Sequence, residues 1–197
     1  MLRDKLKGFD IILASASPRR RQLLEGIDLD FTIENGGDIE EIFDPTMNVM
    51  LVPEYLAELK SKEFARALNH NEILITADTM VLCDNEILGK PLDRQDAVAM
   101  LVKLSGKKHK VLTGVFIRSN SKSRSFTATT DVYFRDLSMK EIEYYVDKYN
   151  PYDKAGAYGA QEWIGYIAIS RIEGSYFNVM GLPVQRLYIE LDKFLSD

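Results

Sequence analysis

The chain is poor in the residues that build disulfide frameworks and histidine metal centres. Its 197 residues include one cysteine, Cys83, and two histidines. One cysteine excludes an internal disulfide, and two histidines exclude a histidine-rich metal cluster. A lone cysteine also fits a reducing compartment, so we expect a cytoplasmic protein.

Several motifs and long segments are missing as well. No apolar run reaches transmembrane length, and Met1 to Asp10 lacks the apolar stretch of a signal peptide. Neither a G-x-G-x-x-G fingerprint nor a Walker loop is present. A net charge of −5 argues against general affinity for nucleic acid or anionic membranes. With 46% hydrophobic and 28% charged residues, the composition is that of an ordinary globular domain, expected to span 1–197.

Hydrophobic patterning predicts a mixed α/β fold without a regular βαβ series. Strands are expected at Ile11–Ala14, Asp28–Glu34, Glu72–Cys83, Lys110–Arg118, Ser125–Phe134 and Ile164–Ile172. Helices are expected from Pro18, over Asn48–Leu68, after Asp93, from Ser138 to Tyr149, and after Pro183. His109 is expected at the surface or at a sheet edge.

The stretch that follows the first strand has the features of an anion site. Ser17 and Pro18 are typical of a helix start, as N-cap and first helical residue. Arg19, Arg20 and Arg21 then occupy a first turn in which the helix dipole disfavours cations. An anion held between the free backbone N–H groups and the guanidinium groups would remove this conflict. The alternative is a solvated basic turn.

Three further charged positions are candidates for the same site. Asp78 interrupts an apolar strand, so it needs a partner, a metal ion or an open cleft; otherwise it bonds to backbone at a strand kink. Lys60 falls on or beside the apolar face of its helix, as a snorkelling lysine or as a phosphate ligand. Lys90 lies in a restricted Gly-Lys-Pro turn.

The acidic stretch 38–41 is either a solvated turn or a source of a ligand for a hard divalent cation.

Taken in order along nearly the whole chain, these blocks resemble the Maf family of nucleoside triphosphate pyrophosphatases. The blocks are Ser15-Ala16-Ser17-Pro18-Arg19-Arg20, Asp38-Ile39-Glu40-Glu41, Lys60, Ala77-Asp78-Thr79, Leu88-Gly89-Lys90-Pro91, Leu104-Ser105-Gly106, Asp153-Lys154-Ala155-Gly156-Ala157-Tyr158, Gly174-Ser175-Tyr176 and Gly181-Leu182-Pro183. The resemblance implies a fold like that of the inosine triphosphate pyrophosphatases, with a largely antiparallel mixed sheet, flanking helices, and two lobes around a cleft. It also implies hydrolysis between the α- and β-phosphates of a nucleoside triphosphate, and a homodimer is a further expectation.

In this interpretation Asp78 is the general base or orients the attacking water. A divalent cation, foremost Mg²⁺, with Mn²⁺ or Co²⁺ as alternatives, would bind Asp78 and Glu41. The phosphate-binding residues would be Ser15, Arg19, Arg20, Lys60 and Lys90.

Three positions separate the dTTP/UTP group of the family from the group that favours 7-methyl-GTP. Here they are Arg19, Thr79 and Gln161, the pattern of the dTTP/UTP group. One departure is Glu162, which stands after Gln161 where a glycine is common. The alternatives are a 7-methyl-GTP pyrophosphatase and a nucleotide-sensing septation regulator with little turnover.

Overall fold

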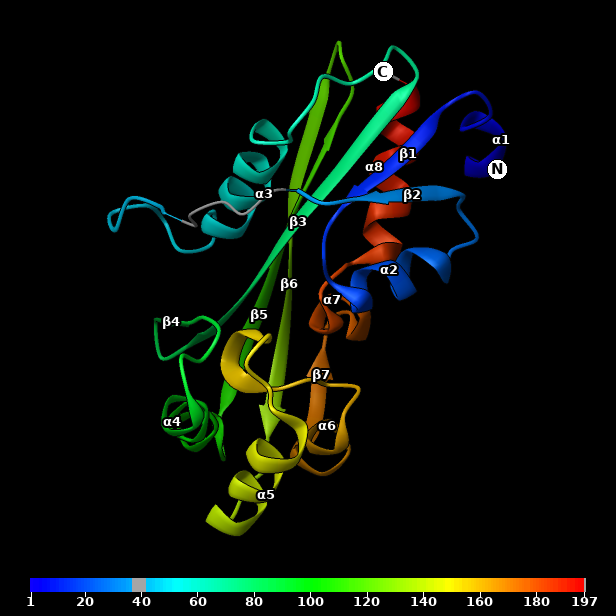
Figure 1. The fold of residues 1–197 in the computed structure, drawn as a ribbon. Coiled ribbons are helices and arrows are strands. Elements are labelled where there is room, and N and C mark those ends of the chain that lie inside the picture. The colour runs from blue at the N-terminus through cyan, green and yellow to red at the C-terminus, as the bar shows by residue number, and fades with distance from the viewer. Residues whose placement is uncertain (37–41, 197) are drawn as a thin grey trace. The chain divides into compact units, whose positions relative to one another are not determined.

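The computed structural model describes residues 1–36 and 42–196 of the chain. These residues form eight α-helices, seven strands and one short 3₁₀ turn (Figure 1). In chain order they are α1 (Leu2–Lys5), β1 (Asp10–Ala14), α2 (Pro18–Glu25), β2 (Phe31–Glu34), α3 (Val52–Lys62), β3 (Glu72–Cys83), β4 (Glu86–Leu88), α4 (Arg94–Leu104), β5 (Lys108–Arg118), β6 (Ser123–Phe134), α5 (Met139–Tyr149), η1 (Ala155–Ala157), α6 (Trp163–Ala168), β7 (Ile169–Glu173), α7 (Tyr176–Met180) and α8 (Val184–Ser196).

The strands form one seven-stranded mixed sheet, as the α/β prediction required. Its order is β2-β1-β3-β5-β6-β7, with β4 paired to β3. β1 runs parallel to both β2 and β3, whereas β4 is antiparallel to β3 and β7 is antiparallel to β6. β5 and β6 are neighbours joined by the short turn after Arg118, so they form an antiparallel hairpin.

The chain divides into two compact units, which are described separately. Unit 1 comprises Met1–Asp78, Thr113–Ala128 and Gly181–Asp197, and unit 2 comprises Thr79–Leu112 and Thr129–Met180. The long strands β3, β5 and β6 each contribute residues to both units. The predicted cleft stays a prediction.

In unit 1, two helices from opposite ends of the chain lie side by side (Figure 1). Lys5 of α1 pairs with Asp192 of α8 at 2.8 Å, and the Leu2 N–H donates to the Tyr188 hydroxyl at 3.3 Å. The apolar face of α8 includes the fully buried Leu187 and Leu191. Burial of such side chains contributes roughly 1.5–3 kcal/mol each to folding, so α8 is an integral part of unit 1.

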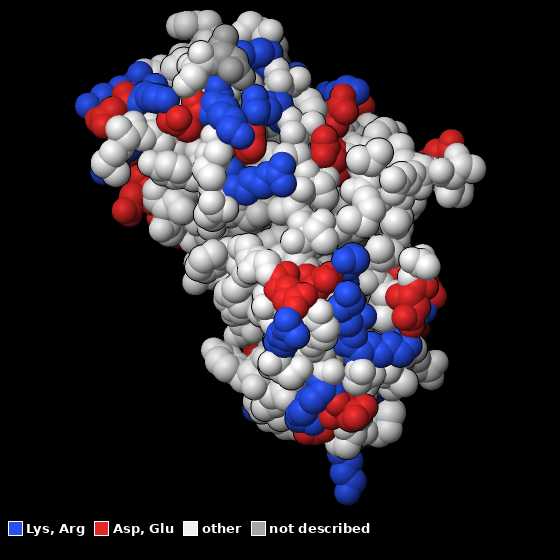
Figure 2. Space-filling model, turned by 180° about the vertical axis from the view of Figure 1, so that it is seen from behind, with Lys and Arg blue, Asp and Glu red and all other residues white. Residues whose placement is uncertain are grey.

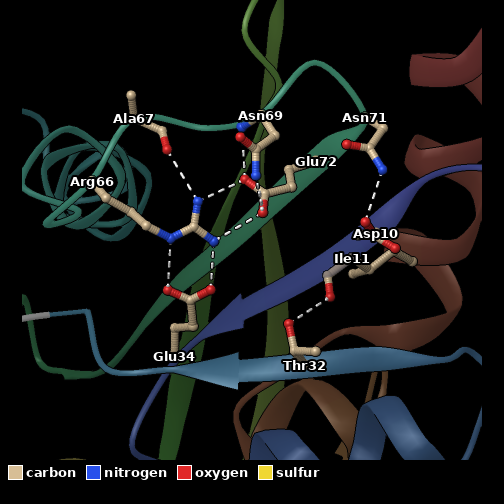
Figure 3. Close-up of polar contacts among 9 residues, drawn as sticks. All are labelled: Asp10, Ile11, Thr32, Glu34, Arg66, Ala67, Asn69, Asn71 and Glu72. Atoms are coloured by element: carbon tan, nitrogen blue, oxygen red, sulfur yellow. Dashed lines mark hydrogen bonds and ion pairs between the residues drawn. The ribbon is translucent and has the colours of Figure 1, made fainter.

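One arginine ties the end of β2 to the start of β3 (Figure 3). The Arg66 guanidinium donates twice to Glu34, at 2.6 and 3.2 Å, and twice to Glu72, at 2.7 and 3.0 Å. Glu72 also accepts the Asn69 N–H at 2.7 Å. The Arg66 and Asn69 donors hold the pKa of Glu72 at about 2. The side chain of Glu72 is therefore fixed as a carboxylate.

The core of unit 2 is packed around β3, β5, β6 and the helices α4, α5 and α6. Its fully buried members include Leu101, Leu104, Tyr145, Val146 and Ile164. α4 and α5 are also joined at the surface, where Arg94 donates to both oxygens of Asp147 at 2.6 and 2.9 Å.

His109 lies in this core, so its predicted surface position is wrong. The residue is only 2% exposed, Nε2 is 2.8 Å from the Tyr158 hydroxyl, and the ring packs edge-on against Phe134. Burial disfavours the imidazolium and lowers the pKa of His109 to about 4. The histidine is a neutral core residue.

Two other local predictions are also wrong. The expected strand Ile164–Ile172 begins as the helix α6 and becomes extended only from Ile169. Its apolar run has no period that separates a buried helix from a buried strand. The expected helix over Asn48–Leu68 is shorter, from Val52 to Lys62.

Charged side chains of both signs share the surface. On the face in Figure 2, lysine and arginine side chains stand beside aspartates and glutamates. In the described part of the chain, the exposed Lys107 pairs with Asp84 and the half-buried Arg124 pairs with the buried Glu190, each at 2.6 Å. Among the described residues, no helix has both the length and the apolar character needed to cross a bilayer.

Candidate active site

The serine loop after β1 is a short turn that opens α2. The Ser17 side chain caps the helix by accepting the Arg20 N–H at 3.5 Å, and Pro18 takes the first helical position, as predicted. The Ser15 hydroxyl oxygen accepts the Ser17 N–H at 3.2 Å. Because Ser15 acts as an acceptor inside the loop, its hydroxyl proton is left to donate to a ligand.

The three arginines of this turn have different surroundings. Arg21 is exposed and pairs with Glu25 at 2.8 Å, one turn along the helix. Arg20 donates through Nε to the Gly181 carbonyl and through Nη1 to the Ala77 carbonyl, both at 2.8 Å. Arg20 Nη1 also lies 3.4 Å from the Ser15 hydroxyl. Arg19 is half-buried.

Arg20 thus connects the serine loop to β3. Two of its donors hold backbone carbonyls, so the guanidinium has a fixed orientation beside the residue that precedes Asp78. Sequence reasoning assigned Arg20 to phosphate alone. The structure adds a scaffolding contact that charge patterning could not reveal.

Asp78 has the buried environment that its place in an apolar strand predicted. It is 6% exposed, and Oδ1 accepts a hydrogen bond from the Lys60 ammonium at 2.5 Å. Lys60 comes from the last turn of α3 and its side chain is 19% exposed. The pair satisfies the requirement that a buried carboxylate be compensated.

The position of α3 is fixed by two close approaches to the sheet. The Thr76 hydroxyl donates to the Ala57 carbonyl at 2.6 Å. Gly114 of β5 lies so close to the start of α3 that a Cβ there would be 2.2 Å from the Pro53 carbonyl carbon. The absence of a side chain at Gly114 therefore allows α3, and with it Lys60, to approach β3.

Unit 2 holds the remaining predicted residues that the structure describes. Thr79 follows Asp78 in β3 and is half-buried, and Lys90 is exposed just after β4. The Gly89 carbonyl accepts the Gly156 N–H at 3.0 Å. This bond joins the turn that carries Lys90 to the small-residue segment that leads to Gln161.

Gln161 lies in a tight turn whose surroundings are charged and buried. The Glu162 carboxylate accepts hydrogen bonds from the Tyr145 hydroxyl and, at 3.0 Å, from the Lys154 ammonium. Lys154 is only 7% exposed and also contacts Asp153 at 2.7 Å. Burial, together with the bond to Glu162, raises the pKa of the Tyr145 phenol, which keeps it a donor.

Tyr145, Lys154 and Glu162 were not identified as site residues from the sequence. Tyr145 reads as one member of the apolar face of α5, together with Ile142 and Val146. The available sequence feature was Glu162, a carboxylate at a position where the resemblance leads one to expect glycine.

The structure brings Ser15, Arg20, Lys60 and Asp78 together in unit 1, and it places Thr79, Lys90 and Gln161 in unit 2. Glu41 lies outside the described residues. Within the described part of the chain, no group of three metal-binding side chains is found. A Mg²⁺ site that completes its coordination with substrate phosphates and water requires only one or two carboxylates, so Asp78 fits such a site.

A capped serine loop, arginines in the first helical turn and a buried carboxylate–lysine pair form an arrangement that can hold a phosphate group and orient a water molecule. The family described as Maf-like protein matches residues 10–194, and the chain belongs to this family.

Several relatives match over nearly their full length, and each is named dTTP/UTP pyrophosphatase. The protein of Bacteroides thetaiotaomicron is 49% identical over 95% of this chain and 97% of its own. The protein of Porphyromonas gingivalis is 49% identical over 97% of both chains. The protein of Flavobacterium johnsoniae is 47% identical over 95% of this chain and 96% of its own.

Two solved structures are more distant. A HAM1 protein from Coxiella burnetii has a TM-score of 0.46 and 13% identity, covering 64% of this chain and 73% of its own. A nucleoside-triphosphatase / dITP/XTP pyrophosphatase from Mycobacterium abscessus has a TM-score of 0.43 and 10% identity, covering 95% of this chain and 97% of its own.

Proposed function

We propose that the chain hydrolyses dTTP and UTP to the nucleoside monophosphate and pyrophosphate. The observation that carries the proposal is the cluster of Ser15, Arg20, Lys60 and Asp78 in unit 1. This cluster supplies an anion-binding loop and a buried carboxylate within one unit. The substrate class comes from the relatives of 47–49% identity that are named dTTP/UTP pyrophosphatase.

Binding of the triphosphate uses the basic groups and the loop. The N–H groups at the start of α2, the Ser15 hydroxyl and the Arg19 guanidinium hold phosphate oxygens. Lys60 and Lys90 supply further positive charge. For phosphoryl chemistry, positioning and electrostatic stabilisation are the principal catalytic effects available to the protein.

Asp78 acts on the water. Its carboxylate accepts a proton from a water that attacks phosphorus in line with the bond to the leaving oxygen. A new oxygen–phosphorus bond forms, the bond between the α- and β-phosphates breaks, and pyrophosphate leaves. The Lys60 contact keeps Oδ1 in place. The second oxygen is then the one that orients the water.

Asp78 and Glu41 would hold a divalent cation, foremost Mg²⁺. A bound cation would neutralise charge that develops on the phosphate oxygens. Because a pure binding protein gains nothing from a carboxylate beside a triphosphate, Asp78 favours the enzyme over a nucleotide sensor.

The base is read by Thr79 and Gln161, with Arg19 completing the pattern of the dTTP/UTP group. A pyrimidine edge can exchange hydrogen bonds with a glutamine amide and a threonine hydroxyl. The wrong base leaves these groups unpaired, and this lowers its kcat/KM.

The test is pyrophosphate release from dTTP, UTP, CTP and 7-methyl-GTP with Mg²⁺, comparing wild type with Asp78→Ala. Turnover of dTTP and UTP should fall by at least about 100-fold in the variant. Asp84→Ala, which removes an exposed carboxylate after the same strand, is the matched control and should keep wild-type activity. If the protein binds nucleotides but releases no pyrophosphate with any metal ion, the enzyme hypothesis fails and the septation-linked nucleotide sensor takes its place. Preferred turnover of 7-methyl-GTP would overturn the proposed substrate class.

A further inference from the structure

The turn that carries Gln161 is closed by its own backbone. The Glu162 N–H donates to the Gly159 carbonyl at 3.0 Å, so Ala160 and Gln161 are the two central residues of a β-turn. Gln161 therefore projects from the tip of a four-residue loop. Its orientation depends on what holds the two ends.

Both ends of this turn are attached to the same phenol. The Gly159 N–H donates to the Tyr145 hydroxyl oxygen at 3.1 Å, and the Tyr145 hydroxyl donates to the Glu162 carboxylate. Lys154 binds the other oxygen of that carboxylate at 3.0 Å. Tyr145 itself is fully buried in α5. A rigid helix thus anchors the first and last residues of the turn.

Two close approaches leave little space around this turn. A Cβ at Gly159 would lie 2.9 Å from the Glu162 carboxyl carbon, and a Cβ at Gly165 would lie 1.9 Å from the Ala160 carbonyl oxygen. Both glycines therefore mark places where chain segments touch directly. The turn is packed against its own carboxylate and against α6.

A glutamine amide requires such support in order to distinguish two pyrimidines. Uracil and thymine present an N3–H donor beside the O4 acceptor, whereas cytosine presents an N3 acceptor beside the N4 amino donor. A freely rotating amide could pair with either edge, because it has both a carbonyl oxygen and an NH₂ group. Only an amide of fixed orientation distinguishes uracil or thymine from cytosine.

The Gln161 amide oxygen has the environment of such a group. Gln161 Oε1 is buried and has no hydrogen-bond partner among the residues that the structure describes. A buried acceptor without a partner destabilises the fold, because the desolvation of the oxygen is not compensated. A ligand N–H would remove this cost.

We propose that Tyr145 and Glu162 are positioning residues for Gln161, and that they fix its amide oxygen as the acceptor for the N3–H of uracil or thymine. The inference deepens the proposed function and rests on it. Neither residue touches the phosphates in this assignment. Their contribution is to selectivity between UTP and CTP, and the chemical step at Asp78 does not depend on them.

The experiment compares Tyr145→Phe with Tyr149→Phe. Both variants delete one phenol oxygen from the same helix, and the two rings stack at 5.1 Å, so Tyr149→Phe is a matched control. We expect Tyr145→Phe to lower the ratio of kcat/KM for UTP to that for CTP about tenfold. The change should lie in a higher KM for UTP, with kcat within about twofold of wild type. Tyr149→Phe should keep the wild-type ratio.

Substitutions at Glu162 provide a second set of variants that test the positioning role. Glu162→Ala should reduce the ratio as Tyr145→Phe does, and Glu162→Gln, which keeps an acceptor for the Tyr145 hydroxyl, should recover part of it. An unchanged ratio in Tyr145→Phe, or a fall in kcat that is equal for both nucleotides, would overturn the positioning role. Circular dichroism and thermal melting establish that each variant is folded.

Binding of α,β-methylene analogues of UTP and CTP separates this inference from the proposed function. Wild type should bind the UTP analogue more tightly by calorimetry, and Tyr145→Phe should lose that preference. If wild type binds with this preference but releases no pyrophosphate, the proposed reaction fails and the positioning role stands. If wild type hydrolyses UTP while Tyr145→Phe keeps the binding preference, the positioning role alone fails. If wild type shows no preference between the analogues, the inference is overturned.

Discussion

The Nζ atom of Lys60 lies 2.5 Å from Oδ1 of Asp78, and the pair joins the last turn of α3 to the middle of β3. The two side chains are 19% and 9% exposed. A charge pair that is largely removed from water costs desolvation energy and is strongly destabilising when only one member is deleted. The pair is thus both a part of the proposed site and a structural link.

Lys60→Met should therefore reduce the free energy of unfolding and the activity together. Loss of the ammonium leaves Asp78 buried without its cation, and we expect a destabilisation of about 2–4 kcal/mol. The double variant Lys60→Met/Asp78→Asn removes both charges and should regain most of that stability while staying inactive. Urea denaturation of the two single variants and the double variant measures the coupling. Additive losses would show that the contact contributes nothing to stability.

Gly114→Ala should displace α3. A Cβ at this position would lie 2.2 Å from backbone atoms of Pro53 and Glu54, so the helix must move or β5 must bend. Overpacking of this kind costs roughly 1–3 kcal/mol, and the displacement should also weaken turnover through Lys60. Gly89→Ala is the control, because no atom lies within 4 Å of a Cβ there. Equal melting temperatures for the two variants would contradict the close approach.

The ion pair between Arg66 and Glu72 should affect the free energy of unfolding at acidic pH. The pKa of Glu72 is lowered from 4.5 to about 2 in the folded protein, so folding is favoured where Glu72 is ionised. This stabilisation is present above about pH 4.5 and is lost as the pH falls toward 2. Arg66→Met should flatten the dependence of the urea midpoint on pH in that window. Lys62→Met, which removes an exposed ion pair with Glu58, should leave it unchanged.

His109 should produce a second pH dependence at higher pH. Its pKa is lowered from 6.5 to about 4 by burial, so protonation is easier in the unfolded chain. The free energy of unfolding should therefore be constant above about pH 6.5 and decrease between pH 6.5 and 4, by up to about 3 kcal/mol. His109→Gln should remove this decrease, while His70→Gln, at the exposed histidine, should retain it. A decrease that persists in His109→Gln would assign the effect to other groups.

The sequence allowed prediction of those elements whose ends are marked by local chemistry. Ser17 and Pro18 begin α2, Asp93 caps α4 and Ser138 caps α5, as expected; the structure adds that the cap at Ser138 is a capping box. β3 spans Glu72–Cys83 as predicted, because its apolar run is long and bounded. These features depend on neighbours within a few residues.

Features that depend on distant neighbours were not predictable in the same way. His109 stands between lysines in the sequence, which predicts an exposed position, but in β5 its side chain lies in the core and contacts Tyr158. The need of Asp78 for a partner could be deduced from burial cost, whereas Lys60 was only one of several candidate cations. The attachment of Arg20 to the Gly181 carbonyl spans most of the chain and leaves no local trace. The burial of His109, the partner of Asp78 and the attachment of Arg20 are all determined by tertiary contacts.

That long-range attachment has a consequence for synthesis on the ribosome. Unit 2 is complete once Met180 has emerged, whereas unit 1 still lacks Gly181–Asp197, which contains α8 and the carbonyl that Arg20 binds. Chains fold from the N-terminus as they are made, yet here the first strands of unit 1 must wait for Gly181 and α8, which are made after the whole of unit 2. Nascent chains that stop before Gly181 should therefore contain all of unit 2 but lack the carbonyl that holds Arg20 beside the serine loop. The Arg20 contact that orients the serine loop would then form only after unit 2 has been made.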